Sequence, residues 1–314
     1  MRILVTGGAG FIGSHVADAL LAQGHEVAII DDLSTGRREN VPAAATFHEG
    51  DIRDAALLTR IFDQHKPEIV SHQAAQTSVS ISTREPLRDA SINVLGTLEL
   101  LQQCVRTKVD RIVFASTGGA VYGEVAEPKL ARVDWQPCPL SPYACSKFAV
   151  EGYLRAYGHE HGLRSTILRY ANVYGPRQDP HGEAGVVAIF CQRLLDRQPL
   201  SIYARRESGD PGCVRDYVFV SDVVRANVLA VQGKHSEPIV NVCTGVGITT
   251  LELASALGKV LNVEPELRFG PRRAGDVERS VLDGAGLLQS YPATSIAEGL
   301  RQTAAWFAEH RAKA

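Results

Sequence analysis

The sequence predicts an α/β fold built on a doubly wound parallel sheet. Its first half alternates short β-branched runs with longer helical segments, which is typical of parallel sheets with helices on both faces. The apolar runs are continuous rather than alternating, as expected of strands buried on both sides. The predicted strands are 3–6 (ILVT), 26–30 (EVAII), 68–72 (EIVSH), 111–116 (RIVFAS) and 165–170 (STILRY).

The second half of the chain has a different texture. After about residue 175, loops rich in Gly, Pro and Arg separate shorter helices and strands. We therefore expect a first domain over residues 1–175 and a smaller α/β lobe, mainly for substrate, over 176–314. Because the segments 214–220 (VRDYVFV) and 238–242 (PIVNV) return to a core-like pattern, part of this half is expected to rejoin the main sheet.

Composition excludes several classes of partner. The 33 basic and 35 acidic residues nearly cancel, so we expect neither nucleic acid nor membrane binding by general attraction. No apolar run approaches the roughly 20 residues that a transmembrane helix needs. The N-terminus begins with a strand and a glycine turn rather than a signal peptide. The cysteines lack metal-binding spacing, so we expect reduced thiols and no metal. The absence of a signal-peptide pattern leads us to expect a cytoplasmic protein.

A glycine-rich turn follows the first predicted strand. Gly7, Gly10 and Gly13 precede an amphipathic helix, where glycines make the tight turn and admit a pyrophosphate to the backbone N–H groups. The second strand ends at Asp31, 18 residues beyond Gly13, where a carboxylate can accept hydrogen bonds from a ribose. This context predicts a Rossmann dinucleotide site.

The acidic residue also indicates which dinucleotide is bound. A carboxylate at Asp31 repels a 2′-phosphate, which favours NAD over NADP. Arg37 and Arg38 follow nearby and could hold that phosphate, although we interpret them as solvated loop charges. The remaining alternative is a glycine turn that only packs the helix against the strand.

A tyrosine and a lysine form the candidate catalytic pair. Tyr143 and Lys147 lie four residues apart in SPYACSK, so on a helix they share one face. Lowering a tyrosine pKa of about 10 by roughly 3 units takes about 4 kcal/mol, which a lysine ammonium and a cationic nicotinamide can supply. Such a pair alone is often an ordinary surface contact. Ser116 and Thr117, at the carboxyl end of a predicted strand, make the combination specific.

Together these motifs resemble the extended short-chain dehydrogenase/reductase family, and within it the UDP-glucose 4-epimerases. The resemblance spans almost the whole chain and implies reversible, NAD-dependent inversion of the carbon 4 hydroxyl of a UDP-hexose through a 4-keto sugar. Related dehydratases and decarboxylases carry carboxylates where this chain has Gly118, Gly119 and Ala120. The segments that carry the resemblance to the epimerases are TGGAGFIGSH, DDLSTG, GDIRD, HQAAQTSV, NVLGT, VYG, SPYACSK, RYANVYGPRQ, RDYVFVSDV and RRAGDVERS.

The resemblance assigns the catalytic roles. It implies Tyr143 as the acid/base and Lys147 as its pKa-lowering, ribose-binding partner. It also implies a Ser or Thr hydroxyl as the third catalytic group, which in related enzymes commonly lies at the position of Gly118. We expect Thr117 to take this role here, with Ser116 as the alternative.

The same resemblance implies further cofactor contacts. Two of them have simpler alternatives, because Asp51 could cap the following helix and Asn93 could bond a neighbouring backbone. The further expected cofactor contacts are Phe11, Ile12, Asp51, Ile52, Ala74, Ala75, Gln76, Asn93 and Tyr170.

The resemblance also outlines a substrate pocket. It implies that Arg215 and Arg273 clamp the pyrophosphate, although each alone could be a surface charge. The small side chain of Ser280 would leave room for an N-acetyl group, so we expect UDP-N-acetylglucosamine to be accepted too. The expected substrate contacts are Thr117, Asn172, Val186, Val187, Tyr203, Arg215, Arg273, Asp276 and Ser280.

Two other functions stay open at this point. One is another UDP-sugar epimerase, such as a UDP-glucuronate 4-epimerase, and the other is a catalytically silent NAD-binding sensor. The resemblance further suggests a homodimer formed through helices near residues 95–105 and 145–160.

Overall fold

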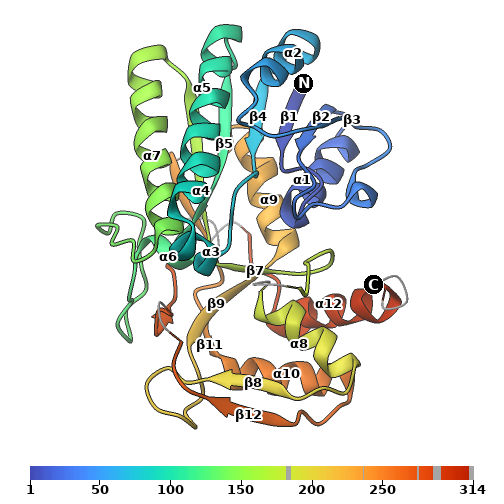
Figure 1. Ribbon diagram of the computed structural model, residues 1–314, viewed down its shortest axis with the longest axis vertical. Helices are drawn as coiled ribbons and strands as arrows, with labels where there is room; N and C mark the ends of the chain where they lie inside the picture. The colour runs from blue at the N-terminus through green and yellow to red at the C-terminus, as the bar shows by residue number, and fades with distance from the viewer. Residues whose placement is uncertain (182–184, 236, 274–275, 286–290, 311–314) are drawn as a thin grey trace. The chain divides into compact units, whose positions relative to one another are not determined.

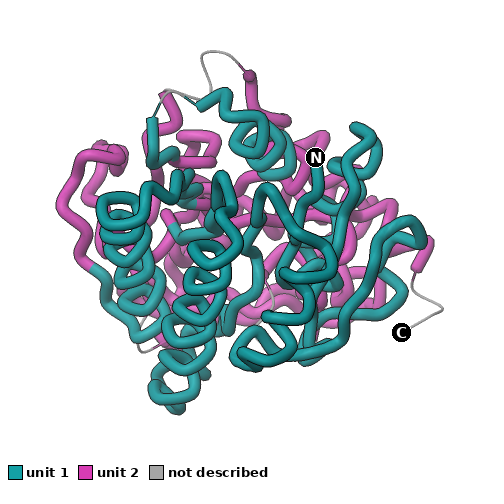
Figure 2. Tube along the Cα trace, turned by 90° about the horizontal axis from the view of Figure 1, so that it is seen from above, with its two compact units in different colours: residues 1–117, 139–169, 223–240 teal, residues 118–138, 170–222, 241–314 magenta. Residues whose placement is uncertain are grey.

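The computed structural model describes residues 1–181, 185–235, 237–273, 276–285 and 291–310. The chain forms two compact units, coloured separately in Figure 2. Unit 1 comprises residues 1–117, 139–169 and 223–240, and unit 2 comprises 118–138, 170–222 and 241–314. Each unit is thus assembled from several stretches of chain. The division of roles expected at residue 175 stays a prediction.

A seven-stranded sheet confirms the predicted α/β fold (Figure 1). Its order is β10-β6-β5-β4-β1-β2-β3, and the pairs β1–β2, β1–β4, β2–β3 and β4–β5 are parallel. The run β3-β2-β1-β4-β5-β6 is the strand order of dinucleotide-binding sheets. The strands are β1 (Arg2–Thr6), β2 (Glu26–Asp31), β3 (Thr46–Glu49), β4 (Ile69–His72), β5 (Arg111–Thr117), β6 (Arg164–Tyr170) and β10 (Ile239–Val242).

The strand order determines which face of the sheet the helices of unit 1 cover. The crossovers β1–β2 and β3–β4 run in opposite directions along the sheet, so right-handed connections place their helices on opposite faces. The unit 1 helices up to residue 161 are α1 (Phe11–Ala22), η1 (Arg38–Asn40), α2 (Ala55–His65), α3 (Val79–Arg84), α4 (Pro86–Ala90), η2 (Ser91–Leu95), α5 (Gly96–Thr107) and α7 (Pro142–His161). A further helix, α9 (Val220–Val231), ends in unit 1.

The start of α7 is fixed by its own sequence. The Ser141 hydroxyl caps the helix by accepting a hydrogen bond from the Ala144 N–H at 3.2 Å. Pro142 occupies the first turn, where its missing N–H costs nothing. Tyr143 is therefore held in the first turn of the helix and Lys147 one turn later.

Unit 2 contains two smaller sheets. One has the order β11-β9-β13 with β7 also paired to β9, and the other pairs β12 with β8. Its strands are β7 (Asn172–Tyr174), β8 (Leu200–Tyr203), β9 (Val214–Phe219), β11 (Gly247–Thr249), β12 (Leu267–Gly270) and β13 (Arg279–Ser280). Its helices include α6 (Gly118–Val121), α8 (Val186–Leu195), α10 (Thr250–Leu261) and α12 (Ile296–His310).

The two segments expected to return to the main sheet behave differently. Residues 239–242 do so as β10, next to β6. Residues 214–219 instead form β9, whose partners β7, β11 and β13 all belong to unit 2. Apolar content made both segments strands, but it did not specify which sheet each would join. Within the described residues, no helix has the length and apolar character needed to cross a membrane.

Candidate active site

The glycine turn is shaped by close backbone contacts. Gly7 has φ +68°, and a Cβ on it would lie 2.7 Å from the Ala74 nitrogen. A Cβ on Gly13 would lie 2.0 Å from the Gly7 carbonyl oxygen. Only glycine therefore fits at these two positions. Gly10, the residue before α1, has no side chain with which to cap the helix, as expected where the first-turn N–H groups receive a phosphate.

Asp31 ends β2 beside this turn. Its carboxylate accepts hydrogen bonds from the Ala9 and Leu33 N–H groups, both at 2.9 Å. Burial raises the pKa of Asp31, and these backbone bonds counteract the rise. The nearby arginines have other contacts: Arg37 pairs with Glu39 at 3.7 Å, and the Arg38 guanidinium lies 4.6 Å from the Phe47 ring centroid.

A buried polar network follows β4. Asn93 accepts a hydrogen bond from the Gln76 N–H at 2.8 Å and donates to the Gln76 carbonyl at 3.0 Å. Its amide nitrogen also lies within hydrogen-bond distance of Asp89 and Ser146, at 3.1 Å each. Backbone bonding, the simpler alternative for Asn93, is therefore present. Through these hydrogen bonds, Asn93 connects the loop after β4 to both η2 and α7.

The simpler alternative for Asp51 is wrong. The cap of α2 is Asp54, which accepts a hydrogen bond from the Leu57 N–H at 2.9 Å. Asp51 instead accepts hydrogen bonds from the backbone and the guanidinium of Arg53, which lower its pKa. The remaining expected cofactor residues lie in α1 (Phe11, Ile12), before α2 (Ile52), after β4 (Ala74, Ala75) and at the end of β6 (Tyr170).

Tyr143, Lys147 and Thr117 meet at the end of β5. The side chains of Tyr143 and Thr117 share a hydrogen bond. The Lys147 ammonium donates to the Ala115 carbonyl at 2.9 Å and lies 4.8 Å from the Phe114 ring centroid. The sequence-predicted catalytic residues are thus brought together within unit 1.

Burial dominates the electrostatics of this group. It raises the pKa of Tyr143 to about 12, although the hydrogen bond with Thr117 acts in the opposite direction. It lowers the pKa of Lys147 to about 8, against the upward effects of Asp89 and Glu151. The pKa of Lys147 therefore lies close to neutral pH, as is common for lysines at functional sites.

Ser116 is engaged elsewhere. Its hydroxyl donates to Glu151 Oε1 at 2.6 Å, and Glu151 in turn pairs with Arg169 at 2.5 Å. This geometry favours Thr117 over Ser116 as the catalytic hydroxyl. Sequence reasoning missed Glu151, although it continues the stripe of Tyr143 and Lys147 at the next helical turn.

In unit 2, several predicted substrate residues gather around Cys213. Its thiol is hydrogen-bonded to Arg215 and also interacts electrostatically with Arg273 and Asp276. The Arg273 guanidinium bonds Asp276 at 2.9 Å and lies 4.6 Å from the Tyr203 ring centroid. Two basic groups, one carboxylate and one aromatic ring therefore share this part of the unit.

Ser280 lies beside this group on β13. It is paired in register with Arg215 on β9. Its side chain is buried, and its Oγ has no hydrogen-bond partner among the described residues. Asn172 begins β7, and Val186 and Val187 begin α8. Ala274 and Gly275 of the neighbouring RRAGD segment lie outside the described residues.

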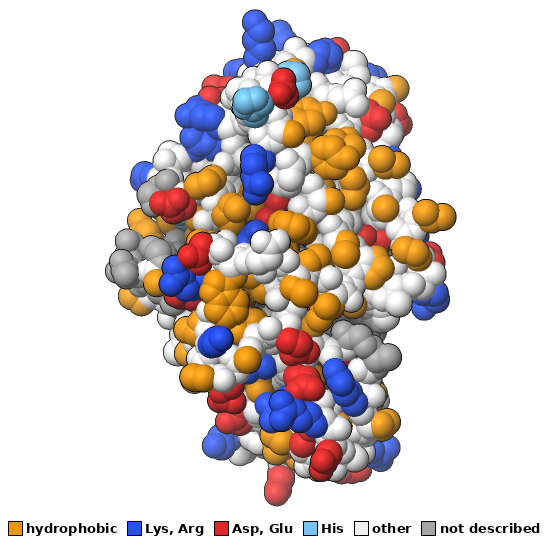
Figure 3. Space-filling view, turned by 90° about the vertical axis from the view of Figure 1, so that its left-hand side faces the viewer, with side chains coloured by type: hydrophobic (Ala, Val, Ile, Leu, Met, Phe, Trp, Pro, Cys, Tyr) orange, Lys and Arg blue, Asp and Glu red, His pale blue; other side chains and the backbone are white. Residues whose placement is uncertain are grey.

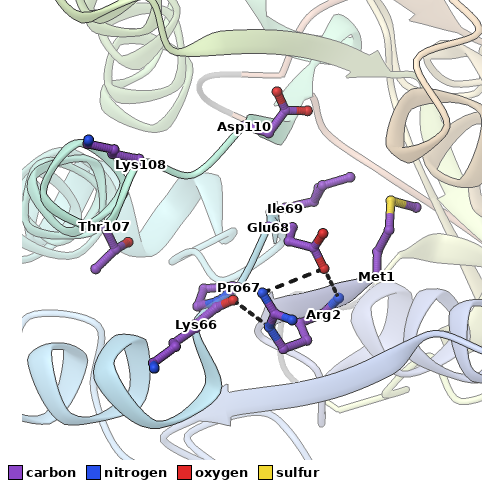
Figure 4. Close-up of a pocket in the computed structure, with 9 residues that line it drawn as sticks. All are labelled: Met1, Arg2, Lys66, Pro67, Glu68, Ile69, Thr107, Lys108 and Asp110. Atoms are coloured by element: carbon purple, nitrogen blue, oxygen red, sulfur yellow. Dashed lines mark hydrogen bonds and ion pairs between the residues drawn. The ribbon is translucent and has the colours of Figure 1, made fainter.

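A surface pocket at the other end of the sheet is a different feature (Figure 4). It surrounds Arg2, at the start of β1, and Ile69, at the start of β4. Arg2 is tied there through its N–H to Glu68 and through its Nε to the Lys66 carbonyl, both at 2.8 Å. Doubly wound sheets bind ligands at the carboxyl ends of their strands, so this pocket is not the candidate site.

Comparison with known proteins identifies the family. Residues 3–243 match the NAD dependent epimerase/dehydratase family. The chain belongs to this family. The family resemblance found in the sequence is thereby confirmed. Family membership also accounts for the glycine turn, whose geometry suits a dinucleotide.

Individual members of the family are similar over their whole length. A UDP-glucose 4-epimerase of Mycolicibacterium smegmatis is 44% identical over 316 residues, 98% of each chain. The structure of the Thermus thermophilus UDP-glucose 4-epimerase in complex with NAD has 51% identity and a TM-score of 0.94, covering 98% of this chain and 99% of that one. The Thermotoga maritima UDP-glucose 4-epimerase with UDP-glucose has 46% identity and a TM-score of 0.93, covering 99% and 100%.

Proposed function

We propose that this chain is a UDP-glucose 4-epimerase that uses NAD to interconvert UDP-glucose and UDP-galactose. The observation that carries the proposal is the meeting of Thr117, Tyr143 and Lys147 at the carboxyl end of β5. The full-length similarity to proteins of that name supports it.

The residues present fit NAD. The glycine turn leaves a cradle that a Cβ on Gly7 or Gly13 would fill, and Asp31 ends the adjacent strand. The backbone of this turn would hold the pyrophosphate, and Asp31 the adenosine ribose. When bound, NAD would supply the acceptor for the hydride of carbon 4 and the hydride donor for reduction of the resulting ketone.

Tyr143 performs the proton transfer in this proposal. Its phenolate takes the proton of the 4-hydroxyl, while Thr117 donates a hydrogen bond to the sugar oxygen. Bringing a pKa of about 12 down to neutrality takes about 7 kcal/mol, so ionisation requires the charge of Lys147 and of the oxidised cofactor. In the return step Tyr143 gives the proton back to the carbonyl oxygen on carbon 4, once the sugar has turned so that the opposite face of that carbon is reduced.

Unit 2 would hold the nucleotide portion of the substrate. Arg215 and Arg273 offer guanidinium forks to the two phosphates, and Asp276 and Tyr203 would contact the uridine. Asn172, Val186 and Val187 complete the proposed contacts. Such a clamp on UDP leaves the hexose free to turn before reduction.

The test is to release bound nucleotide by denaturing pure protein, and to separate the epimers formed from UDP-glucose. We expect NAD from the protein and UDP-galactose in the reaction, with turnover lost in Tyr143→Phe. Turnover of UDP-glucuronate instead would favour the uronate epimerase. Bound NAD without turnover of any UDP-sugar would favour the silent sensor, and absence of any pyridine nucleotide would overturn the proposal.

A second substrate pair follows from Ser280. Its side chain is small and buried, and its hydroxyl has no hydrogen-bond partner in the part of the chain that the structure describes; both features favour a pocket that also accepts UDP-N-acetylglucosamine. Incubating the enzyme separately with the plain and the acetylated sugar tests this. Ser280→Tyr should reduce turnover of the acetylated sugar more than that of UDP-glucose, and complete inertness of the parent enzyme toward the acetylated sugar refutes the idea.

The protein is further proposed to be a homodimer. Exposed apolar side chains lie on the neighbouring elements α3 (Val79), α4 (Leu87), η2 (Leu95) and α7 (Tyr153). Figure 3 views the side that carries α7, with hydrophobic side chains in orange. Exposed apolar side chains gathered on neighbouring elements are typical of interfaces.

A cytoplasmic location is also proposed. All six cysteines are free thiols, and Cys104, Cys191, Cys213 and Cys243 are buried. Unpaired cysteines are usual in reducing compartments. Cell fractionation with an antibody against the chain would test the location.

A further inference from the structure

Three consecutive residues at the end of β5 contact three residues on one face of α7. Ala115 accepts a hydrogen bond from Lys147 at 2.9 Å. Ser116 donates to Glu151 at 2.6 Å, and Thr117 is bonded to Tyr143. Residues 143, 147 and 151 are spaced by four, so they lie one above another on the helix. The catalytic pair is therefore continued by a third contact, through Glu151.

Glu151 is also joined to a third element. Arg169 on β6 donates to its carboxylate from Nε at 3.0 Å and from Nη2 at 2.5 Å. Glu151 is 0% exposed and Arg169 is 2% exposed. Burying such a pair carries a large desolvation penalty, and apolar replacements are often equally stable. The pair therefore calls for an explanation other than stability.

The charges around Lys147 supply that explanation. Glu151 and Asp89 both raise the pKa of Lys147, whereas burial lowers it. His72, on β4, also interacts with Lys147, and Tyr143 lies one turn earlier on α7. Removing either anionic group would favour the neutral amine, which cannot stabilise a phenolate.

We propose that Glu151, held by Arg169, is a positioning residue for the catalytic pair. It fixes α7 against the end of β5 and provides the counter-charge for the Lys147 ammonium. This role rests on the proposed epimerase function, because it acts through Lys147 and Tyr143 rather than on the substrate.

The first experiment compares pH profiles of epimerisation by the NAD-bound enzyme. The alkaline limb reports loss of the Lys147 proton. Glu151→Gln keeps an acceptor for Ser116 but loses the charge, so its limb should move to lower pH by about one unit or more. Arg169→Met leaves an uncompensated carboxylate, so its limb should move to higher pH.

The double variant Glu151→Gln/Arg169→Met guards against simple misfolding. It removes both charges, and its limb should return toward that of the parent enzyme. The matched control is Asp222→Asn in unit 2, which removes another buried carboxylate, one that accepts from the Thr294 N–H at 2.9 Å. This control should lower the melting temperature without moving the limb. Limbs that stay in place, or that move the same way in both single variants, would overturn the proposal.

A second measurement does not depend on turnover. Tyrosinate absorbance of the NAD-bound protein is followed against pH, and the curve of the matching Tyr143→Phe variant is subtracted to isolate Tyr143. Glu151→Gln should change this isolated titration, whereas Asp222→Asn should leave it unchanged. If the parent protein lacks epimerase activity but this difference appears, the proposed function fails and the role of Glu151 stands. An identical Tyr143 titration in parent and Glu151→Gln contradicts that role.

Discussion

Thr117 and Ser116 illustrate how neighbouring residues of the same chemistry acquire different roles. Both are hydroxyls at the end of β5, and the sequence favoured Thr117 only because it lies next to the position of Gly118. The Ser116 hydroxyl is bonded to Glu151, whereas the Thr117 hydroxyl is bonded to Tyr143. The choice depends on contacts between a strand and a helix that are separated in sequence.

Replacing Thr117 with alanine should reduce turnover on the order of tenfold or more, because one hydrogen bond to the transition state is lost. Steady-state kinetics on UDP-glucose measure this effect. Thr107→Ala serves as the matched control, since its hydroxyl bonds the Gln103 carbonyl within α5. Unchanged turnover in Thr117→Ala would remove this residue from the catalytic group.

His72 was not predicted from the sequence, yet it links several elements. Thr97 donates its hydroxyl proton to the Asn93 carbonyl at 2.6 Å, so it must accept from His72 Nε2 at 2.8 Å. His72 Nδ1 is then the acceptor for Thr6, at 2.6 Å. This arrangement requires a neutral ring. Burial, reinforced by the charge of Lys147, lowers the pKa of His72 to about 3.

The neutral ring predicts loss of stability in acid. The unfolded chain takes up a proton near pH 6.5, well above the folded pKa of about 3, so this contribution is complete above pH 6.5 and declines as the pH falls toward 3. At pH 5 the cost is about 2 kcal/mol. His72→Gln should therefore lose less unfolding free energy between pH 7 and 5 than the parent does. Denaturant titrations measure this, and the exposed His159→Gln should behave like the parent.

At the scale of elements, the sequence predicts what is local. The five predicted strands are present within one residue of their expected ends, because each is a continuous apolar run. β3 was missed because it is short and only partly buried. The partners of β9 could not be predicted, since periodicity does not encode which strands pair. The pairing of Glu151 with Arg169 escaped prediction for the same reason, as it joins a helix to a strand.

The turn between β1 and α1 offers a sharp test at this scale. Gly13→Ala would place a Cβ 2.0 Å from the Gly7 oxygen, so the turn must open and NAD retention should be lost. Nucleotide released on denaturation measures this directly. Gly152→Ala within α7 is the control, because its Cβ would meet nothing within 4 Å. A Gly13→Ala protein that retains NAD at the parent level would contradict this account of the turn.

At the scale of the whole molecule, the exposed apolar side chains on unit 1 are the main unexplained feature. Leu87 is 86% exposed and Leu95 is 57% exposed, on α4 and η2 respectively. The contacts of α4 and η2 with α7 bring these residues onto the same group of helices as Tyr153. A stable dimer typically buries about 1,600 Å² in total, and exposed leucines are suited to its apolar centre.

The proposed homodimer predicts that Leu87→Glu/Leu95→Glu separates the subunits. Association of the variant would bury carboxylates without partners, at a cost of several kcal/mol, so its dissociation constant should rise at least tenfold. Sedimentation velocity over a range of concentrations measures this change. Val246→Glu is the matched control, since Val246 is 58% exposed but lies in unit 2. A monomeric parent protein, or a double variant that dimerises as the parent does, would rule out this face as the interface.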